Sequence, residues 1–302
     1  MPAPEVLHDR LLPWYAVHRR DLPWRDQDRS PWGVLVSEVM LQQTPVSRVL
    51  PVWERWMSRW PTPSALADAP TGDAVREWGR LGYPRRALRL HAAATVVRDA
   101  HDDEVPADEA VLRTLPGVGD YTAAAVAAFA FGRRATVVDT NVRRVQARSV
   151  TGLALPAPAL TRAETSLAAR LLPQDDAVAA RWSVAVMELG ALVCTARAPR
   201  CTECPLVDLC AWRAAGSPAP SGPPRRGQRW TGTDRQCRGT LLQLLRDSPG
   251  PVPAERLQAA WPTPGAEEPE EAARQRERCL DALVAEGLVE PLPGARFRLP
   301  GT

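Results

Sequence analysis

The stretch LPGVGDYTAAA, residues 115–125, decides the fold of this 302-residue chain. A Leu-Pro pair leads into a tight turn formed by Gly117, Val118 and Gly119, and a helix of small residues follows it. The glycines can adopt positive φ, and the turn leaves backbone N–H groups beside a helix N-terminus, where a phosphate oxygen binds well. With the helical segment DEAVLRT before it, the stretch predicts a helix-hairpin-helix that contacts the DNA backbone irrespective of base sequence.

Helical patterns extend on both sides of this stretch up to about residue 215. Apolar residues recur there at helical spacing, Pro and Gly separate the segments, and no series of alternating strands appears. The fold class is therefore predicted to be mostly α.

The composition changes after residue 215. Residues 216–227, GSPAPSGPPRRG, are typical of a linker. Three helices are predicted in RGTLLQLLRDS, PAERLQAAW and QRERCLDALVAEGLVE, and a β-hairpin follows that turns near Pro293 and Gly294. The acidic stretch PGAEEPEEAARQ is predicted to be a solvated loop. Residues 228–302 are therefore predicted to form a small winged-helix-like domain, with an acidic helical appendage as the alternative.

The composition also limits the chemistry. All 38 basic residues are arginines, and the net charge is +3. Without lysine the chain has no side-chain amine that could form a Schiff base, whereas arginine binds phosphate well. Neither a run of about 18 apolar residues nor a signal-peptide pattern occurs, so we expect a cytoplasmic, nucleoid-associated protein.

Four of the six cysteines are clustered. Their pattern is C-x6-C-x2-C-x5-C, formed by Cys194, Cys201, Cys204 and Cys210. Zinc sites usually contain two Cys-x2-Cys pairs, and only one such pair occurs here, which favours a 4Fe–4S cluster over zinc. The other two cysteines, Cys237 and Cys279, are expected to be small buried hydrophobic residues.

Two carboxylates lie in contrasting contexts. Glu38 interrupts the apolar helix WGVLVSEVMLQQT, which predicts a raised pKa. Asp139 follows the apolar run in ATVVDTNVRRV and is placed to cap the next helix, whose N–H groups and dipole stabilise an anion. One neutral acid and one anion are the pair that glycosidic bond cleavage uses. A satisfied half-buried glutamate and a simple helix cap are the alternative interpretations.

Taken in order, these features resemble the endonuclease III superfamily of DNA glycosylases, and within it the MutY-type adenine glycosylases. The matching stretches are RRDLPWR, SEVMLQQTPV, EWGRLGYPRRALRLHAAA, LPGVGDYTAAAVAAFAFG, VVDTNVRRV and MELGALVCTARAPRCTECPLVDLC. The resemblance implies a six-helix barrel over residues 25–134, which carries the hairpin. It also implies an iron–sulfur domain formed by residues 1–24 and 135–215.

The same resemblance implies an enzyme that removes a base without cutting the strand. Members that cut the strand carry a lysine where this chain has Tyr121. By the same analogy Glu38 protonates adenine and Asp139 stabilises the cationic sugar, while Tyr121 and Asn141 position these groups.

Further residues are implied to contact DNA. A flipped adenine would lie between Trp24 and Leu41, and Arg25 would read its edge. Gln42, Gln43 and Tyr83 match positions that members insert at the lesion pair. The implied partner of a monomeric enzyme is duplex DNA containing adenine opposite 8-oxoguanine or guanine.

The chain also departs from the MutY-type pattern. Its C-terminal region does not resemble the Nudix-like domain that reads 8-oxoguanine. Val184 stands where a polar residue is expected near the adenine, and Pro84 replaces an aromatic residue. Three alternatives therefore stay open: a glycosylase for thymine or uracil opposite guanine, a non-catalytic iron–sulfur DNA-binding module, and a zinc-binding regulator.

Overall fold

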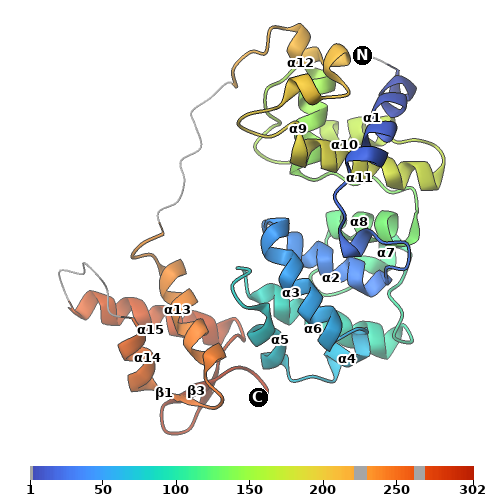
Figure 1. The fold of residues 1–302 in the computed structure, drawn as a ribbon. Coiled ribbons are helices and arrows are strands. Elements are labelled where there is room, and N and C mark those ends of the chain that lie inside the picture. The colour runs from blue at the N-terminus through green and yellow to red at the C-terminus, as the bar shows by residue number, and fades with distance from the viewer. Residues whose placement is uncertain (1–2, 221–229, 262–268) are drawn as a thin grey trace. The chain divides into compact units, whose positions relative to one another are not determined.

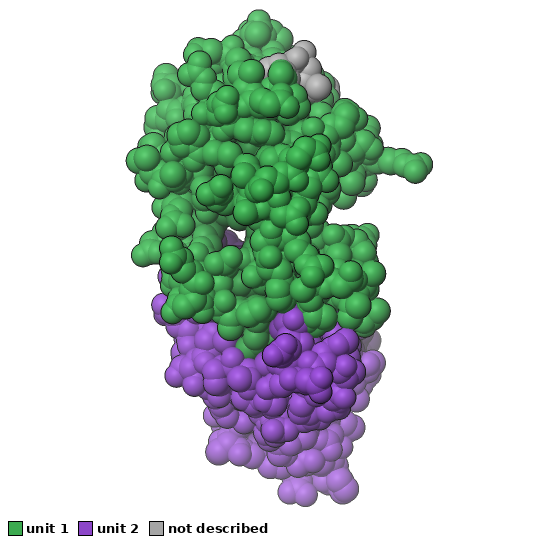
Figure 2. All heavy atoms as spheres, turned by 90° about the vertical axis from the view of Figure 1, so that its right-hand side faces the viewer, with its two compact units in different colours: residues 1–38, 106–114, 118–224 green, residues 39–105, 115–117, 225–302 purple. Residues whose placement is uncertain are grey.

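A computed structural model describes residues 3–220, 230–261 and 269–302. The chain divides into two compact units, which Figure 2 colours separately. The first unit comprises Met1–Glu38, Pro106–Thr114 and Val118–Pro224, and the second comprises Val39–Val105, Leu115–Gly117 and Arg225–Thr302. The domain boundaries expected from the sequence stay a prediction.

The first unit is helical (Figure 1). Its elements are α1 (Pro4–His18), η1 (Pro23–Arg25), α7 (Glu109–Leu112), α8 (Asp120–Phe131), α9 (Thr140–Gln146), η2 (Ala147–Thr151), α10 (Arg162–Leu171), α11 (Asp176–Leu192), η3 (Cys201–Glu203), η4 (Val207–Leu209) and α12 (Ala211–Ala214). α1 and α9 pack against α11, and α10 packs on α9. Leu11, Trp182 and Leu189 are buried in the resulting core, whose apolar area provides the main driving force for folding.

The second unit combines helices with a small sheet. Its elements are α3 (Val46–Arg59), α4 (Pro63–Ala67), α5 (Thr71–Trp78), α6 (Arg85–Ala100), α13 (Asp234–Asp247), β1 (Val252–Pro253), α14 (Ala254–Ala260), α15 (Pro269–Ala285), β2 (Glu290–Leu292) and β3 (Arg296–Arg298), while α2 (Pro31–Leu41) runs from the first unit into the second. α4 and α5 pack against α6. Trp56 and Trp78 are buried, with their rings edge to face and the centroids 5.5 Å apart.

The mostly helical fold is confirmed, and the C-terminal region contains a small sheet. α13, α14 and α15 are the three predicted helices, and β2 and β3 form the predicted antiparallel hairpin. β1 adds a third strand on the other side of β3, in the order β1-β3-β2. Cys237 and Cys279 are buried here, as predicted.

Two predicted segments of the C-terminal region remain, the acidic loop and the linker. The acidic stretch was expected to be a loop as far as residue 275, but α15 already begins at Pro269. Glu270 and Glu271 lie in its first turn, where carboxylates favour the positive end of the helix dipole, so the acidic run starts the helix. Much of the predicted linker, residues 221–227, lies outside the described residues.

The C-terminal domain docks on α5 within the second unit. The Gly72 N–H donates to the Pro300 carbonyl at 2.6 Å. A Cβ added at Gly72 would lie only 2.7 Å from that oxygen, so glycine is required for this approach. Arg246 Nε donates to the Val75 carbonyl at 2.9 Å, and Arg76 Nε donates to the Arg246 carbonyl at 3.1 Å. These backbone contacts hold the domain firmly against the helix.

No helix in the described part of the chain is both long enough and apolar enough to cross a bilayer.

Candidate active site

The predicted helix-hairpin-helix is present, formed by α7, the turn at residues 115–119 and α8. Gly117 has a φ of 82°, and a Cβ there would lie 2.8 Å from the Cβ of Arg89. Gly119 does not use positive φ: it is the extended N-cap of α8, with a φ of −98°. A Cβ added at Gly119 would meet no atom within 4 Å. Neither backbone strain nor packing within the protein therefore requires glycine at position 119.

Glu38 lies on α2 and is 4% exposed. Tyr121, in the first turn of α8, donates its hydroxyl to Glu38 Oε2 at 3.0 Å. Burial raises the pKa of Glu38 to about 7, and the charge of Asp139 adds to the rise, while the Tyr121 hydrogen bond and the charge of Arg25 oppose it. The raised pKa predicted from the sequence is confirmed, and the carboxyl can donate a proton near neutral pH.

Asp139 is the N-cap of α9, as predicted. Its Oδ1 accepts the Val142 N–H at 2.6 Å, and its Oδ2 accepts from Asn141 Nδ2 at 2.7 Å. Burial raises the pKa of Asp139, while these hydrogen bonds and the charge of Arg144 oppose the rise by favouring the anion. The two carboxylates thus differ in their partners: a phenol for Glu38 and a set of N–H donors for Asp139.

A close helix contact fixes the start of α9. A Cβ added at Gly190, on α11, would lie 2.6 Å from the Cβ of Asn141. Arg144 Nη2 donates to Asn141 Oδ1 and to the Gly190 carbonyl, each at 2.7 Å. Arg144 Nε donates to the Cys194 carbonyl, also at 2.7 Å. One guanidinium therefore links the residue that holds Asp139 to the start of the cysteine loop.

A buried carboxylate that the sequence did not single out organises Arg20 and Arg25. Glu188, on α11, has a fully buried side chain and lies 2.8 Å from Arg20 Nη2 and 2.9 Å from Arg25 Nη2. Burial alone would raise the pKa of Glu188, but the hydrogen bonds from both arginines and the charge of Arg25 lower it to about 2. The Arg25 guanidinium is therefore oriented by Glu188, and its expected contact with a base stays a prediction.

A second buried arginine orders the loop after α2. Arg86, on α6, is 6% exposed and gives no local sequence signal of its role. Its Nη1 donates to the carbonyls of Val39, Met40 and Gln42, and its Nη2 donates to Thr44 Oγ1 and the Gly82 carbonyl. Five acceptors from two segments are thus held by one side chain.

Two residues in the segments around Arg86 have positive φ angles. Gln43 has a φ of 55° and Tyr83 a φ of 47°, a region that non-glycine residues rarely adopt. Tyr83 is 51% exposed, and its ring lies 5.5 Å from the Arg86 guanidinium carbon. Two of the three residues expected at a lesion pair, Gln43 and Tyr83, therefore lie on strained turns.

The residues expected to line a base pocket have different surroundings. Trp24 is buried on η1, and Leu41 is partly buried at the end of α2. Val184 packs against the core around α11, in keeping with its apolar side chain. The roles expected for Trp24 and Leu41 stay predictions.

The four clustered cysteines are partly buried in the loop that contains η3 and η4. Burial and the charges of the other three thiols raise the pKa of Cys204 to about 12. No three of the described Cys, His, Asp or Glu side chains are placed to hold a single metal ion. Four cysteine thiolates are the ligand set that a 4Fe–4S cluster takes, so the residues present fit such a cluster.

The cysteine loop is supported by Arg148, a 4% exposed residue of η2. Its Nη1 donates to the Thr195 carbonyl at 2.7 Å and lies 3.4 Å from Cys194 Sγ, and its Nη2 donates to the Ala196 carbonyl at 3.1 Å. A hydrogen-bond donor beside a thiolate ligand stabilises its negative charge.

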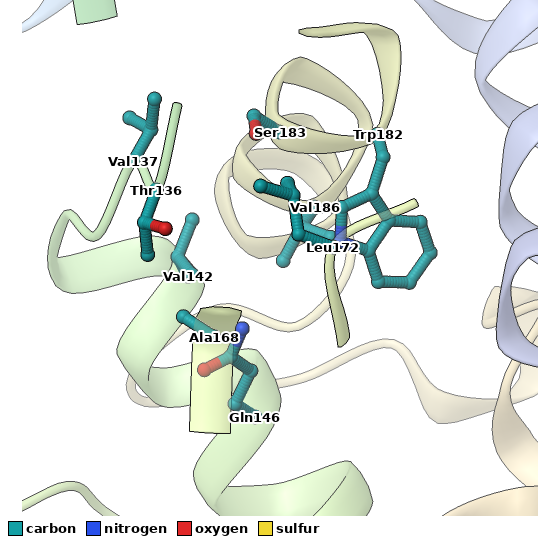
Figure 3. Close-up of a pocket in the computed structure, with 9 residues that line it drawn as sticks. All are labelled: Thr136, Val137, Val142, Gln146, Ala168, Leu172, Trp182, Ser183 and Val186. Atoms are coloured by element: carbon teal, nitrogen blue, oxygen red, sulfur yellow. The ribbon is translucent and has the colours of Figure 1, made fainter. Parts of the chain in front are cut away.

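A small pocket is lined by neither of the two carboxylates (Figure 3). It measures about 10 Å³ and is lined by Thr136, Val137, Val142, Gln146, Ala168, Leu172, Trp182, Ser183 and Val186. Gln146 Oε1 has no hydrogen-bond partner among the described residues. The pocket has room for about one water molecule but not for a nucleobase.

Two stretches of the chain match known protein families. Residues 36–167 match the family described as "HhH-GPD superfamily base excision DNA repair protein", and residues 194–210 match the "Iron-sulfur binding domain of endonuclease III". The adenine DNA glycosylase of Mycobacterium tuberculosis (strain CDC 1551 / Oshkosh) is 54% identical over 308 residues, which cover 100% of this chain and 98% of that protein. The chain belongs to the adenine DNA glycosylase family. As in other members of the superfamily, its cysteine loop binds an iron–sulfur cluster.

The family shares its fold with glycosylases of other specificity. The thymine-DNA glycosylase of Aeropyrum pernix is 38% identical over 211 residues, which cover 68% of this chain and 93% of that protein. A solved structure of a thermostable thymine-DNA glycosylase is 28% identical, with a TM-score of 0.62, and covers 70% of this chain and 97% of its own. The full-length identity to adenine DNA glycosylases nevertheless shows that this chain excises adenine in base excision repair.

Proposed function

We propose that this chain removes adenine from DNA where it is mispaired with 8-oxoguanine or guanine, by hydrolysing the N-glycosidic bond. The observation that carries the proposal is Glu38, a buried carboxyl with a pKa of about 7 that accepts a hydrogen bond from Tyr121. A purine is a poor leaving group until it is protonated, and a carboxyl poised near neutrality can supply that proton. The identity to adenine DNA glycosylases over the full chain supports the same substrate.

The two carboxylates divide the reaction. Glu38 donates its proton to the adenine ring, the bond to the sugar breaks, and the base leaves with the bonding electron pair. Asp139, whose anionic form accepts hydrogen bonds from the donors of α9, stabilises the positive charge that develops on the sugar. Water then adds to the sugar and gives its proton to the Glu38 carboxylate, which returns the enzyme to its starting state. Tyr121 and Asn141 act as positioning residues through their hydrogen bonds to Glu38 and Asp139.

The strand is left intact because the chain has no lysine to attack the sugar. Burial and the charge of Glu38 raise the pKa of Tyr121, so its hydroxyl keeps its proton and remains a donor to Glu38.

The iron–sulfur cluster, when bound, would cross-link the cysteine loop through its four cysteines. This loop begins at Cys194, whose carbonyl accepts a hydrogen bond from Arg144.

The DNA contacts proposed for a monomeric enzyme are the hairpin turn and three side chains after α2 and before α6. The turn at residues 117–119 offers open backbone to a phosphate, while Gln42, Gln43 and Tyr83 meet the mispair. This assignment is supported by the bare backbone at Gly119 and by the positive φ of Gln43 and Tyr83.

A single-turnover base-release assay on matched duplexes tests the proposal. The duplexes carry adenine opposite 8-oxoguanine, guanine or thymine, and thymine or uracil opposite guanine. We expect rapid release of adenine opposite 8-oxoguanine or guanine, with strand breaks only after alkali. Release restricted to thymine or uracil would contradict the adenine assignment, and strand breaks without alkali would contradict the monofunctional one.

A further inference from the structure

Two large exposed aromatic side chains of the second unit flank one arginine. Tyr83 is 51% exposed and Trp230 is 53% exposed. The guanidinium carbon of Arg235, in the first turn of α13, lies 6.0 Å from the Tyr83 ring centroid and 5.4 Å from that of Trp230. The C-terminal domain thereby places an aromatic ring and a cation beside a residue expected at the lesion pair.

The charge of Arg235 is available for a ligand. Among the described residues no carboxylate forms an ion pair with Arg235, because its neighbour Asp234 pairs with Arg278 at 2.9 Å. The nearby Arg238 is different, since it pairs with Glu286. An exposed guanidinium that is stacked on aromatic rings and lacks a protein anion is well placed to bind a phosphate.

This patch is connected to the hairpin turn through contacts of α6. The Tyr83 ring lies 5.5 Å from the Arg86 guanidinium, and Arg86 donates to the Gln42 carbonyl at 2.7 Å. Arg89, on the same helix, lies against Gly117 of the hairpin turn. A series of contacts therefore leads from the phosphate-binding turn through the lesion-pair residues to Arg235 and Trp230.

Docking contacts bring the C-terminal domain against α5. Gly72 and Pro300 approach through their backbones, and Arg246 Nε donates to the Val75 carbonyl of α5. The Arg246 side chain is partly buried at this contact, which lowers its pKa to about 10. Side chains that the fold already holds in place cost less ordering entropy on binding.

From these contacts we propose that Trp230 and Arg235 form a second DNA-contact site, which extends the surface of the barrel onto the C-terminal domain. Arg235 binds a backbone phosphate beside the mispair, and the Trp230 ring packs on a neighbouring sugar or base. The inference rests on the proposed function in taking the same duplex as ligand and in placing Tyr83 at the mispair.

Equilibrium binding of full-length holoenzyme to a duplex with a non-hydrolysable adenine analogue opposite 8-oxoguanine tests the site. Arg235→Ala should raise Kd roughly five- to tenfold near physiological salt and lower the slope of log K against log salt by about 1. Trp230→Ala should raise Kd roughly tenfold without changing that slope, whereas Trp230→Phe should keep most of the affinity, because stacking does not depend on charge.

Arg256→Ala is the matched control. Arg256 is an exposed arginine of α14 in the same domain, and no described carboxylate forms an ion pair with it. We expect its Kd and salt slope to match the wild type. Unchanged binding in both Arg235→Ala and Trp230→Ala would overturn the proposal and leave the patch to a protein partner. Equal losses in Arg256→Ala would overturn it as well, since they would indicate only general attraction by positive charge.

The readout separates this inference from the proposed function. If the wild type binds with the expected Arg235 dependence but releases no adenine from a normal duplex, the activity is wrong and the DNA site stands. If it releases adenine while both variants bind normally, the activity stands and the DNA site is wrong.

Discussion

The two carboxylates of the site are distinguished by their environments rather than by their chemistry. Glu38 is buried beside a phenol, and Asp139 is buried at a helix N-terminus. The sequence could predict both environments, because an apolar helix around Glu38 and a helix start at Asp139 are local patterns. No local pattern indicates the contact between Tyr121 and Glu38, because 83 residues separate the partners, and only the family resemblance implied it.

Asparagine at position 139 separates the chemistry of this residue from its role as a cap. Asn caps a helix about as well as Asp, so Asp139→Asn should fold and bind DNA normally while adenine release becomes undetectable. Asp139→Ala should also lose the cap and about 1 kcal/mol of unfolding free energy.

Asp175→Asn is the control, because Asp175 caps α11 in the same way. It should leave the rate of adenine release unchanged. Single-turnover kinetics and denaturant unfolding measure both quantities. Normal turnover in Asp139→Asn would show that Asp139 is only a cap.

At the level of elements, the crossing of α9 and α11 sets the position of Asp139. Gly190→Ala would bring a methyl group to 2.6 Å from the Asn141 Cβ, so α9 must shift. We expect at least a tenfold slower release of adenine and roughly 1–3 kcal/mol less unfolding free energy, as for other overpacked contacts. Gly239→Ala is the control, because a Cβ there meets nothing within 4 Å. A wild-type rate in Gly190→Ala would refute the account of this crossing.

The cysteine loop makes a separate prediction about metal content. Purified protein should contain iron rather than zinc and absorb broadly near ~400 nm. Cys204→Ser should lose most of this iron, whereas Cys237→Ser, outside the loop, should keep it. Metal analysis of the three proteins decides the matter, and zinc in place of iron would contradict the cluster assignment.

Local sequence patterns predicted the helices better than the contacts between them. The hairpin, the cap of α9 and the C-terminal helices follow from spacing and turn residues. The roles of Glu188 and Arg86 do not, because each depends on partners from distant segments. No local pattern indicates that position 190 must be glycine either, because the close contact that requires it forms only when α9 packs on α11.

At the level of the whole molecule, the C-terminal domain depends on Gly72 for its docking. Gly72→Ala would place a Cβ 2.7 Å from the Pro300 oxygen, a backbone atom that cannot rotate away. We expect faster proteolysis of the C-terminal domain and weaker DNA binding, with an intact iron–sulfur absorbance. Limited proteolysis and the binding assay test this, and wild-type protease resistance would argue against the docking described.

The pH dependence of adenine release tests most directly the central claim, that a protonated Glu38 drives the reaction. With a pKa of about 7, Glu38 carries its proton below that pH, so the single-turnover rate should level off just below it and fall about tenfold per pH unit above it. At acid pH the rate should fall again as Asp139, whose pKa is raised by burial, takes up a proton. The Tyr121 hydrogen bond lowers the pKa of Glu38, so in Tyr121→Phe the fall should move to higher pH. A rate that stays constant well above pH 7, or a fall that moves to lower pH in Tyr121→Phe, would contradict the account.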